Sequence, residues 1–192
     1  MKKLQIAALG LLLVTAFSCK QAKKEAEETT EEVVETVVET IEPKVITFTM
    51  EPKSDSNVNG EVVFTEQDGK VIMRATFTGL EPGEHAIHLH EKADCSAADG
   101  TSTGGHWNPT FQPHGKWGDE GGYHKGDIGN FTADADGNAV LEFSTDQWCM
   151  GCDDDTKNII GKAVIVHKGM DDFVSQPSGA AGARVSCTGI IE

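Results

Sequence analysis

Eight short runs of alternating or β-branched residues, separated by turn signals, constrain the fold of this chain more than any other feature. Such runs, punctuated by Asp-Gly or Pro-Gly, are typical of strands joined by tight turns. The predicted strands cover 45–51, 60–66, 70–80, 85–91, 127–134, 139–144, 159–167 and 183–191. With no helical pattern after Pro43, the domain at 43–192 is predicted to be all-β: an eight-stranded antiparallel Greek-key barrel or sandwich with long loops.

The chain is strongly acidic, with 31 Asp and Glu against 16 Lys and Arg and a formal net charge of −15. Binding to nucleic acid or to anionic lipid headgroups requires clustered basic residues, so the charge balance argues against both. It also argues against an anionic substrate, unless a local positive site overrides the global field.

The first nineteen residues (1–19) form a targeting segment. Lys2 and Lys3 precede an apolar stretch at 4–17, and Cys19 follows small residues. This pattern resembles a bacterial lipoprotein signal, in which the cysteine becomes the lipidated N-terminus. We therefore expect an exported chain, lipid-anchored through Cys19 to a bacterial membrane and facing the periplasm or the cell exterior. A plain secretory signal is the alternative, and both permit disulfides.

Residues 20–42 form an acidic, low-complexity segment without Gly, Pro or aromatic residues. Apolar residues recur at helical spacing between Val33 and Ile41. The stripe is too short for a confident coiled coil. We interpret 20–42 as a tether between the anchor and the domain, with dimerisation as the alternative.

A glycine-rich stretch at 92–126 contains no predicted strand or helix. A structureless segment of this length inside a small domain is expected only where it has a function. This one carries His106, His114 and His124. We therefore predict a long loop that is held in place by metal.

Further histidines lie on the neighbouring predicted strands. His88 and His90 are two residues apart, so both side chains project from one face of a strand, whereas His85 has the opposite parity. Asp127 lies three residues after His124, close enough to share an ion with it. Spacing alone predicts only that the chain binds one or two metals of borderline softness.

Five motifs in fixed order together resemble the copper,zinc superoxide dismutase family, in its bacterial exported form. They are GEHAIHLHEKADC (83–95), GGHWNP (104–109), HKGDIGNFTAD (124–134), IVHKGMDDF (165–173) and GAAGARVSC (179–187). The resemblance covers about residues 45–191. It implies an enzyme that converts superoxide to dioxygen and hydrogen peroxide with a copper ion and a zinc ion as cofactors.

The resemblance also implies roles for individual residues. Copper would be held by His88, His90, His106 and His167, and zinc by His106, His114, His124 and Asp127. Asp171 would connect a copper ligand to a zinc ligand, and His85 would support the site through hydrogen bonds.

Two residues would act in the reaction itself. Arg184 would provide the local positive charge that draws superoxide, the small-molecule partner, to an acidic protein. His106 would deliver a proton. The family contains monomers and dimers, so we expect a monomer or a homodimer.

Four cysteines remain after Cys19, which allow three pairings. The resemblance implies a disulfide between Cys95 and Cys187. Cys149 and Cys152 form a C-x-x-C sequence outside the family pattern, compatible with a redox dithiol, a local disulfide or half of a zinc knuckle. We favour the local disulfide.

Two other functions are compatible with the sequence. A non-enzymatic copper- or zinc-binding module on the same fold would use the same histidines. A thiol redox protein would act through Cys149 and Cys152, and its activity would survive metal removal.

Overall fold

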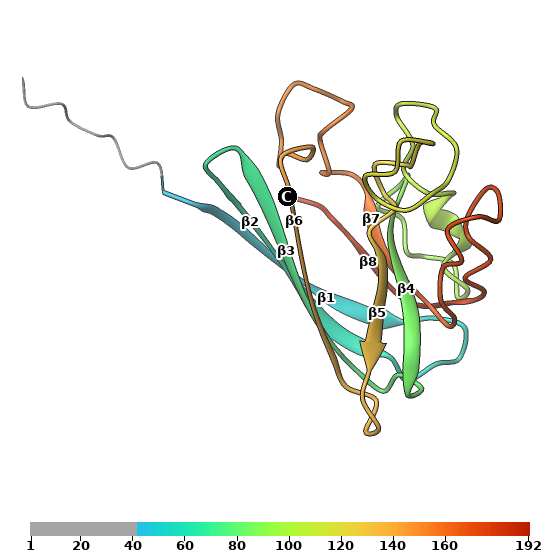
Figure 1. Cartoon of the computed structure of the whole chain (residues 1–192). Coiled ribbons are helices and arrows are strands. Elements are labelled where there is room, and N and C mark those ends of the chain that lie inside the picture. Colours follow the sequence, from blue (N-terminus) through green and yellow to red (C-terminus); the bar gives the residue numbers. More distant parts are fainter. Residues whose placement is uncertain (1–41) are drawn as a thin grey trace, which may run out of the picture. The chain divides into compact units, whose positions relative to one another are not determined.

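All eight predicted strands are present in the computed structural model, which describes residues 42–192 (Figure 1). The predicted signal peptide and all but the last residue of the predicted tether lie outside this range. Within 42–192, no helix has the length and hydrophobicity needed to cross a membrane. The strands are β1 (Lys44–Pro52), β2 (Asn59–Gln67), β3 (Lys70–Thr78), β4 (Gly83–His90), β5 (Gly129–Ala133), β6 (Ala139–Thr145), β7 (Ala163–His167) and β8 (Arg184–Gly189).

The strands form one antiparallel sheet in the order β5-β4-β7-β8-β1-β2-β3-β6, which curls into a nearly closed barrel. β1 joins the two halves because it pairs with β2 over Lys44–Met50 and then with β8 at Glu51 and Pro52. The β3–β4 and β6–β7 connections cross between the halves, so that β3 pairs with β6 and β4 pairs with β7. The predicted all-β Greek-key fold is confirmed.

Most observed boundaries differ from the predicted ones by one or two residues, and the largest difference is at the start of β7. β7 begins at Ala163 rather than 159, because Gly161 adopts a φ of +85° and its N–H donates to the carbonyl of Ile190. The long loop predicted to contain no helix includes one short 3₁₀ turn, Thr101–Thr103.

The core fills the barrel interior with side chains from alternate strand positions. β3 shows the pattern most clearly: Val71, Met73, Ala75 and Phe77 are buried, and the residues between them are exposed. Alternation of this kind is expected of a sheet with one face in water.

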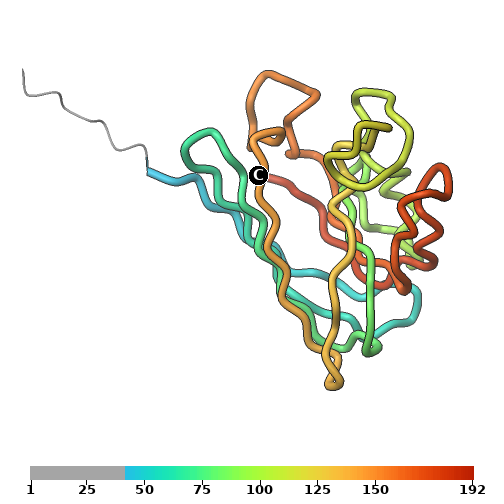
Figure 2. Tube along the Cα trace, viewed as in Figure 1, coloured from blue at the N-terminus to red at the C-terminus, as the bar shows by residue number. Residues whose placement is uncertain are grey.

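Two long connections cover the outside of β4 and β7 (Figures 1 and 2). The first is the β4–β5 connection (91–128), and the second is the β7–β8 connection (168–183). They contact each other where the side chain of Gln176 accepts a hydrogen bond from the N–H of His114 and donates one to its carbonyl. This part of the barrel is therefore buried on both faces.

Candidate metal centre

The strand β4 places two histidines on the outer face of the barrel. Ile87 and Leu89 point into the hydrophobic core, so His88 and His90 project to the opposite side, beneath the loops. Their side chains are nevertheless buried, at 0% and 1% exposure. The spacing of two thus brings both imidazoles to one covered surface.

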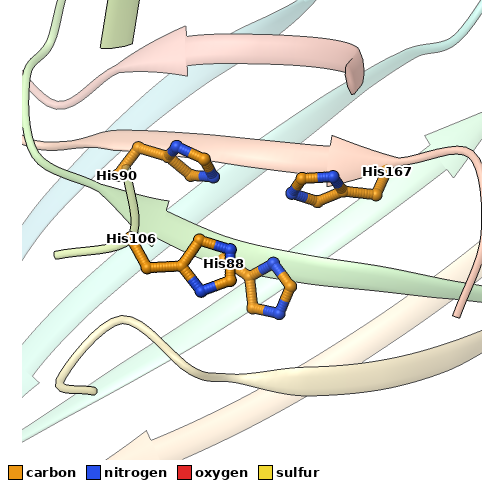
Figure 3. A group of neighbouring side chains, drawn as sticks. All are labelled: His88, His90, His106 and His167. Atoms are coloured by element: carbon orange, nitrogen blue, oxygen red, sulfur yellow. The ribbon is translucent and has the colours of Figure 1, made fainter. Parts of the chain in front are cut away.

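Two further histidines complete a first group around β4. His106 is held beside His90 by an isolated β-bridge, and His167 is the last residue of β7. Figure 3 shows the rings of these four residues turned toward one another. One ring nitrogen from each of the four lies within 4.8 Å of the others.

A second buried group shares His106 with the first. Its members are His106, His114, His124 and Asp127, and their ligand atoms also lie within 4.8 Å of one another. Asp127 is fixed by its backbone neighbours, since its Oδ2 accepts hydrogen bonds from the N–H groups of His124 (2.8 Å) and Gly115 (3.2 Å). The long loop therefore supplies all four members.

Six imidazole nitrogens in the two groups are buried without a hydrogen-bond partner. Nδ1 of His114 and Nδ1 of His124 lie 3.0 and 3.2 Å from the Asp127 carboxylate, but not in hydrogen-bonding geometry. Buried nitrogens normally have partners, and leaving them without one is costly. The unpaired atoms are His88 Nδ1, His90 Nε2, His106 Nε2, His114 Nδ1, His124 Nδ1 and His167 Nε2. Imidazole nitrogens that converge in this way fit borderline metals such as copper and zinc.

In five of the six rings, all but that of His124, the protein holds the opposite nitrogen. Nδ1 of His90 contacts the carbonyl of Gly104 at 3.0 Å, and Nδ1 of His167 contacts the carbonyl of Gly182 at 3.2 Å. Such contacts fix the tautomer and orientation of a ligating ring. The unpaired nitrogen of each ring is thus the one that faces the group.

Asp171 connects the two groups through one carboxylate. Its Oδ2 lies 2.8 Å from Nε2 of His88, and its Oδ1 lies 2.8 Å from Nε2 of His114. Burial would raise the pKa of Asp171, but the two imidazoles lower it overall. The ionised carboxylate therefore orients one ring in each group.

The pKa values of the imidazoles differ between the groups. Burial lowers the pKa of His167 to about 3 and, despite its hydrogen bond to Asp127, lowers that of His106 to about 4. Burial also lowers the pKa of His114, but Asp127 and Asp171 outweigh it and raise the value to about 9. The first group thus favours the neutral imidazole that binds metals.

A cleft of about 570 Å³ reaches the first group from solvent. Its lining includes one basic residue besides the histidines, Arg184, and one acidic residue, Glu91. The Arg184 guanidinium is fixed because it donates to the carbonyls of Gly100 (2.7 Å) and Gly104 (2.8 Å). Arg184 is also the cross-strand partner of His167, which places a cation beside the first group.

The remaining predicted residues are not members of the two groups. His85 is buried, with Nδ1 lying 2.9 Å from the carbonyl of His167. A disulfide joins Cys95 to Cys187, 92 residues apart, and links the long loop to β8. A second disulfide joins Cys149 to Cys152 in the β6–β7 connection.

Sequence reasoning missed three residues that position Asp171 and the long loop. Asn130 exchanges hydrogen bonds with the backbone of Asp171, 2.8 Å each, and Gln176 links the two loops. Gly179 has a φ of +67°, and a Cβ there would lie 1.7 Å from Oδ1 of Asp171. Lone amides carry no pattern in a sequence, but a glycine within ten residues of Asp171, which the resemblance placed between the two groups, was a signal that could have been used.

The family model described as copper/zinc superoxide dismutase matches residues 58–191 of the chain. This range includes every member of the two groups and Arg184.

Among solved structures, the chain resembles a SOD-like protein from Bacillus subtilis with 27% identity and a TM-score of 0.67, covering 76% of this chain and 97% of that one. A mutant of that protein with a proline replaced by histidine gives 28% identity and a TM-score of 0.68, with the same coverage. A double mutant, in which a tyrosine is also replaced by histidine, has 29% identity and a TM-score of 0.68, again with the same coverage.

Proposed function

The chain belongs to the copper/zinc superoxide dismutase family, and from this we propose that it converts superoxide to dioxygen and hydrogen peroxide at a histidine-bound copper. One observation carries the proposal. His106 is a member of both groups, with Nδ1 2.8 Å from Asp127 and Nε2 unpaired toward the first group. One nitrogen of this ring faces each group, so a single imidazole could be a ligand of two ions.

The donor sets distinguish the two ions. Four imidazoles suit copper, and three imidazoles with one carboxylate suit zinc. Copper would be held by His88, His90, His106 and His167, and zinc by His106, His114, His124 and Asp127. When bound, copper would supply the one-electron oxidation of one superoxide and the one-electron reduction of another.

Arg184 would bind and orient the substrate. It is fixed at the wall of the cleft that leads to the first group. A guanidinium in a cleft with low-dielectric walls concentrates anions locally, even though the chain has a net charge of −15. The local charge resolves the conflict between an acidic protein and an anionic substrate.

His106 would handle a proton. Hydrogen peroxide requires two protons per molecule, and Nε2 of His106 faces the group that the cleft reaches. Asp127 holds the opposite nitrogen and keeps the ring oriented. A positioned imidazole can hold a proton at Nε2 and transfer it to the reduced oxygen species.

The test is to purify the chain, measure bound copper and zinc, and follow superoxide loss. We expect fast loss with the loaded chain and a decrease of at least about 10³-fold in a His88→Ala/His167→Ala variant. The matched control is Thr76→Ala, on the exposed face of β3. Equal rates for the loaded chain and the double variant would refute the enzyme.

A non-enzymatic metal-binding module is the second candidate. It is favoured by one observation: the solved relatives from Bacillus subtilis are described as SOD-like proteins. In that case the chain would bind both metals tightly, and superoxide loss would not exceed that with the double variant.

We also propose that the chain is exported and lipid-anchored at Cys19, that superoxide is its substrate, and that it is a monomer or a homodimer. Labelled fatty acid should enter the chain and not a Cys19→Ser variant. Light scattering of the unlipidated chain would distinguish monomer from homodimer.

A further inference from the structure

The Cys149–Cys152 disulfide lies apart from both metal groups, in the β6–β7 connection at 146–162. Its two sulfurs belong to residues of very different accessibility. Cys149 is 7% exposed, whereas Cys152 is an exposed residue. A thiolate arriving from solvent would therefore attack Cys152, and Cys149 would be the leaving group.

The Cys95–Cys187 disulfide differs from it in accessibility and in the length of chain that it closes. Cys187 is 0% exposed in β8, where it packs with Ala163 and Ile165 and with the half-buried Cys95. The bridge also closes a span of 92 residues, compared with 3 for Cys149–Cys152. Reduction of the buried bridge is opposed by poor access and frees the long loop from β8, so the two disulfides should respond differently to a reductant.

Backbone hydrogen bonds hold the Cys149–Cys152 turn independently of the sulfurs. The N–H of Cys149 donates to the carbonyl of Lys157 at 2.9 Å, and the N–H of Ile159 donates to the carbonyl of Cys149 at 3.0 Å. The Asn158 side chain accepts from the N–H of Gly151 (3.0 Å) and donates to the carbonyl of Cys152 (3.2 Å).

The same turn is also fixed to the rest of the domain. The N–H of Met150 donates to the Glu66 carboxylate in β2 at 3.0 Å, and its carbonyl accepts from the Lys44 ammonium at 2.9 Å. The buried indole of Trp148 donates to the carbonyl of Lys125 at 2.8 Å, beside the second metal group. Breaking the S–S bond leaves all of these contacts available.

We propose that Cys149 and Cys152 form a thiol–disulfide exchange site, which an external dithiol reduces while the barrel and both metal groups stay folded. One donor thiolate attacks Sγ of Cys152, the Cys149–Cys152 bond breaks, and Cys149 leaves as a thiolate that takes a proton from water. The second donor thiol then attacks the mixed disulfide and releases Cys152. The donor ends as a disulfide, and the chain gains two electrons and two protons.

The charge around Cys152 selects among donors. Asp153, Asp154 and Asp155 follow it directly, and all three are exposed. Like charges slow the encounter of an anionic reagent with such a surface. The site therefore favours a neutral or cationic dithiol over an anionic thiol such as glutathione.

The experiment uses the purified chain. Free thiols are blocked with N-ethylmaleimide, dithiothreitol is added under native conditions, and new thiols are labelled with iodoacetamide and located by peptide mass spectrometry. We expect Cys149 and Cys152 to be labelled at least about tenfold faster than Cys95 and Cys187. After removal of the reagents, far-UV circular dichroism and zinc affinity should be unchanged.

Three results would overturn the proposal: equal labelling of both pairs, labelling of Cys149 and Cys152 only when the domain unfolds, or loss of zinc affinity on reduction. A Cys149→Ser/Cys152→Ser variant checks the last point without any reductant and should fold and bind zinc normally. An Asp153→Asn/Asp155→Asn variant should react about 2–5-fold faster with glutathione but not with dithiothreitol. Equal rates for wild type and variant with glutathione would refute the charge selection.

Discussion

The two halves of the barrel bury their strands in different ways. In the half formed by β1, β2, β3 and β6, one face is in the core and the other is in water, as the alternation in β3 shows. In the other half, all five residues of β7 and the six from His85 to His90 in β4 are buried. The difference arises because the two long connections cover the outer face of β4 and β7.

A second buried face changes which side chains a strand can carry. The exposed half carries threonines on its outer face, such as Thr47 and Thr76, because water satisfies their hydroxyls. The covered half carries imidazoles there, and buried polar groups need partners. Carbonyls and carboxylates hold one nitrogen in five of the six rings, and the nitrogen that faces the group has no hydrogen-bond partner. The candidate metal centre is thus the polar core of the covered half.

The largest loss of unfolding free energy should come from a substitution in the core of the exposed half. Replacing the fully buried Met73 with Ala should cost about 2–5 kcal/mol of unfolding free energy, because it leaves a cavity in the core. Its neighbour Ile72 is 36% exposed, so Ile72→Ala should cost less than about 1 kcal/mol. Urea denaturation measures both. Similar losses for the two variants would contradict one-sided burial in β3.

The unfolding free energy of the metal-free chain should depend on pH, because the buried imidazoles of the covered half have shifted pKa values. His106 and His167 have folded pKa values of about 4 and 3, below the unfolded value of 6.5, so acid protonates the unfolded state first. Their contribution to the unfolding free energy is present above pH 6.5 and is lost as the pH falls. Each histidine should lose about 1 kcal/mol between pH 6.5 and 5.5.

The pKa of His114 is shifted in the opposite direction, so its effect on stability changes with pH in the opposite sense. Its folded pKa of about 9 lies above 6.5, so its contribution is complete below pH 6.5 and is lost as the pH rises through 9. The loss by pH 8.5 should be about 2 kcal/mol. Urea denaturation of the metal-free chain should therefore show maximal stability near pH 6.5, and His114→Gln should remove the alkaline decrease. A flat profile from pH 5.5 to 8.5 would contradict both assignments.

Asp171→Asn tests the connection between the two groups. The amide cannot accept hydrogen bonds at both positions that face His88 and His114, so the zinc affinity should fall about 10–100-fold. A competition titration with a chromophoric chelator measures it. Asp136→Asn, in the exposed β5–β6 turn, is the matched control. An unchanged zinc affinity would show that the carboxylate does not orient His114.

The smallest expected change comes from altering the charge of the cleft that leads to the first group. Glu91 brings a negative charge to the wall that Arg184 makes positive. For the proposed reaction, Glu91→Gln should therefore raise kcat/KM for superoxide about 2–5-fold at low ionic strength, and the gain should disappear at high salt. Glu84→Gln, at an exposed position near the start of β4, is the control. A gain that persists at high salt would rule out an electrostatic cause.

The sequence predicted the exposed half better than the covered half. Alternation in β3 follows directly from one wet and one buried face, so its residues could be assigned in advance. In β4 the parity of His85, His88 and His90 was sufficient to separate inner from outer positions. Two contacts were not predictable: Gln176 holds His114 of the long loop, and Asn130 of β5 holds the backbone of Asp171. Each depends on a single amide that meets its partner only after the chain has folded.

The placement of Asp171 has a consequence for how the proposed copper and zinc ions would bind. One carboxylate sets the rings of His88 and His114, so occupancy of either group constrains the ring that the other group needs. Binding free energies that share an orienting residue are thermodynamically linked, and the linkage is reciprocal. Zinc titrations performed before and after copper loading should give different curves. The order of loading is then a property of the protein as much as of the supply of ions.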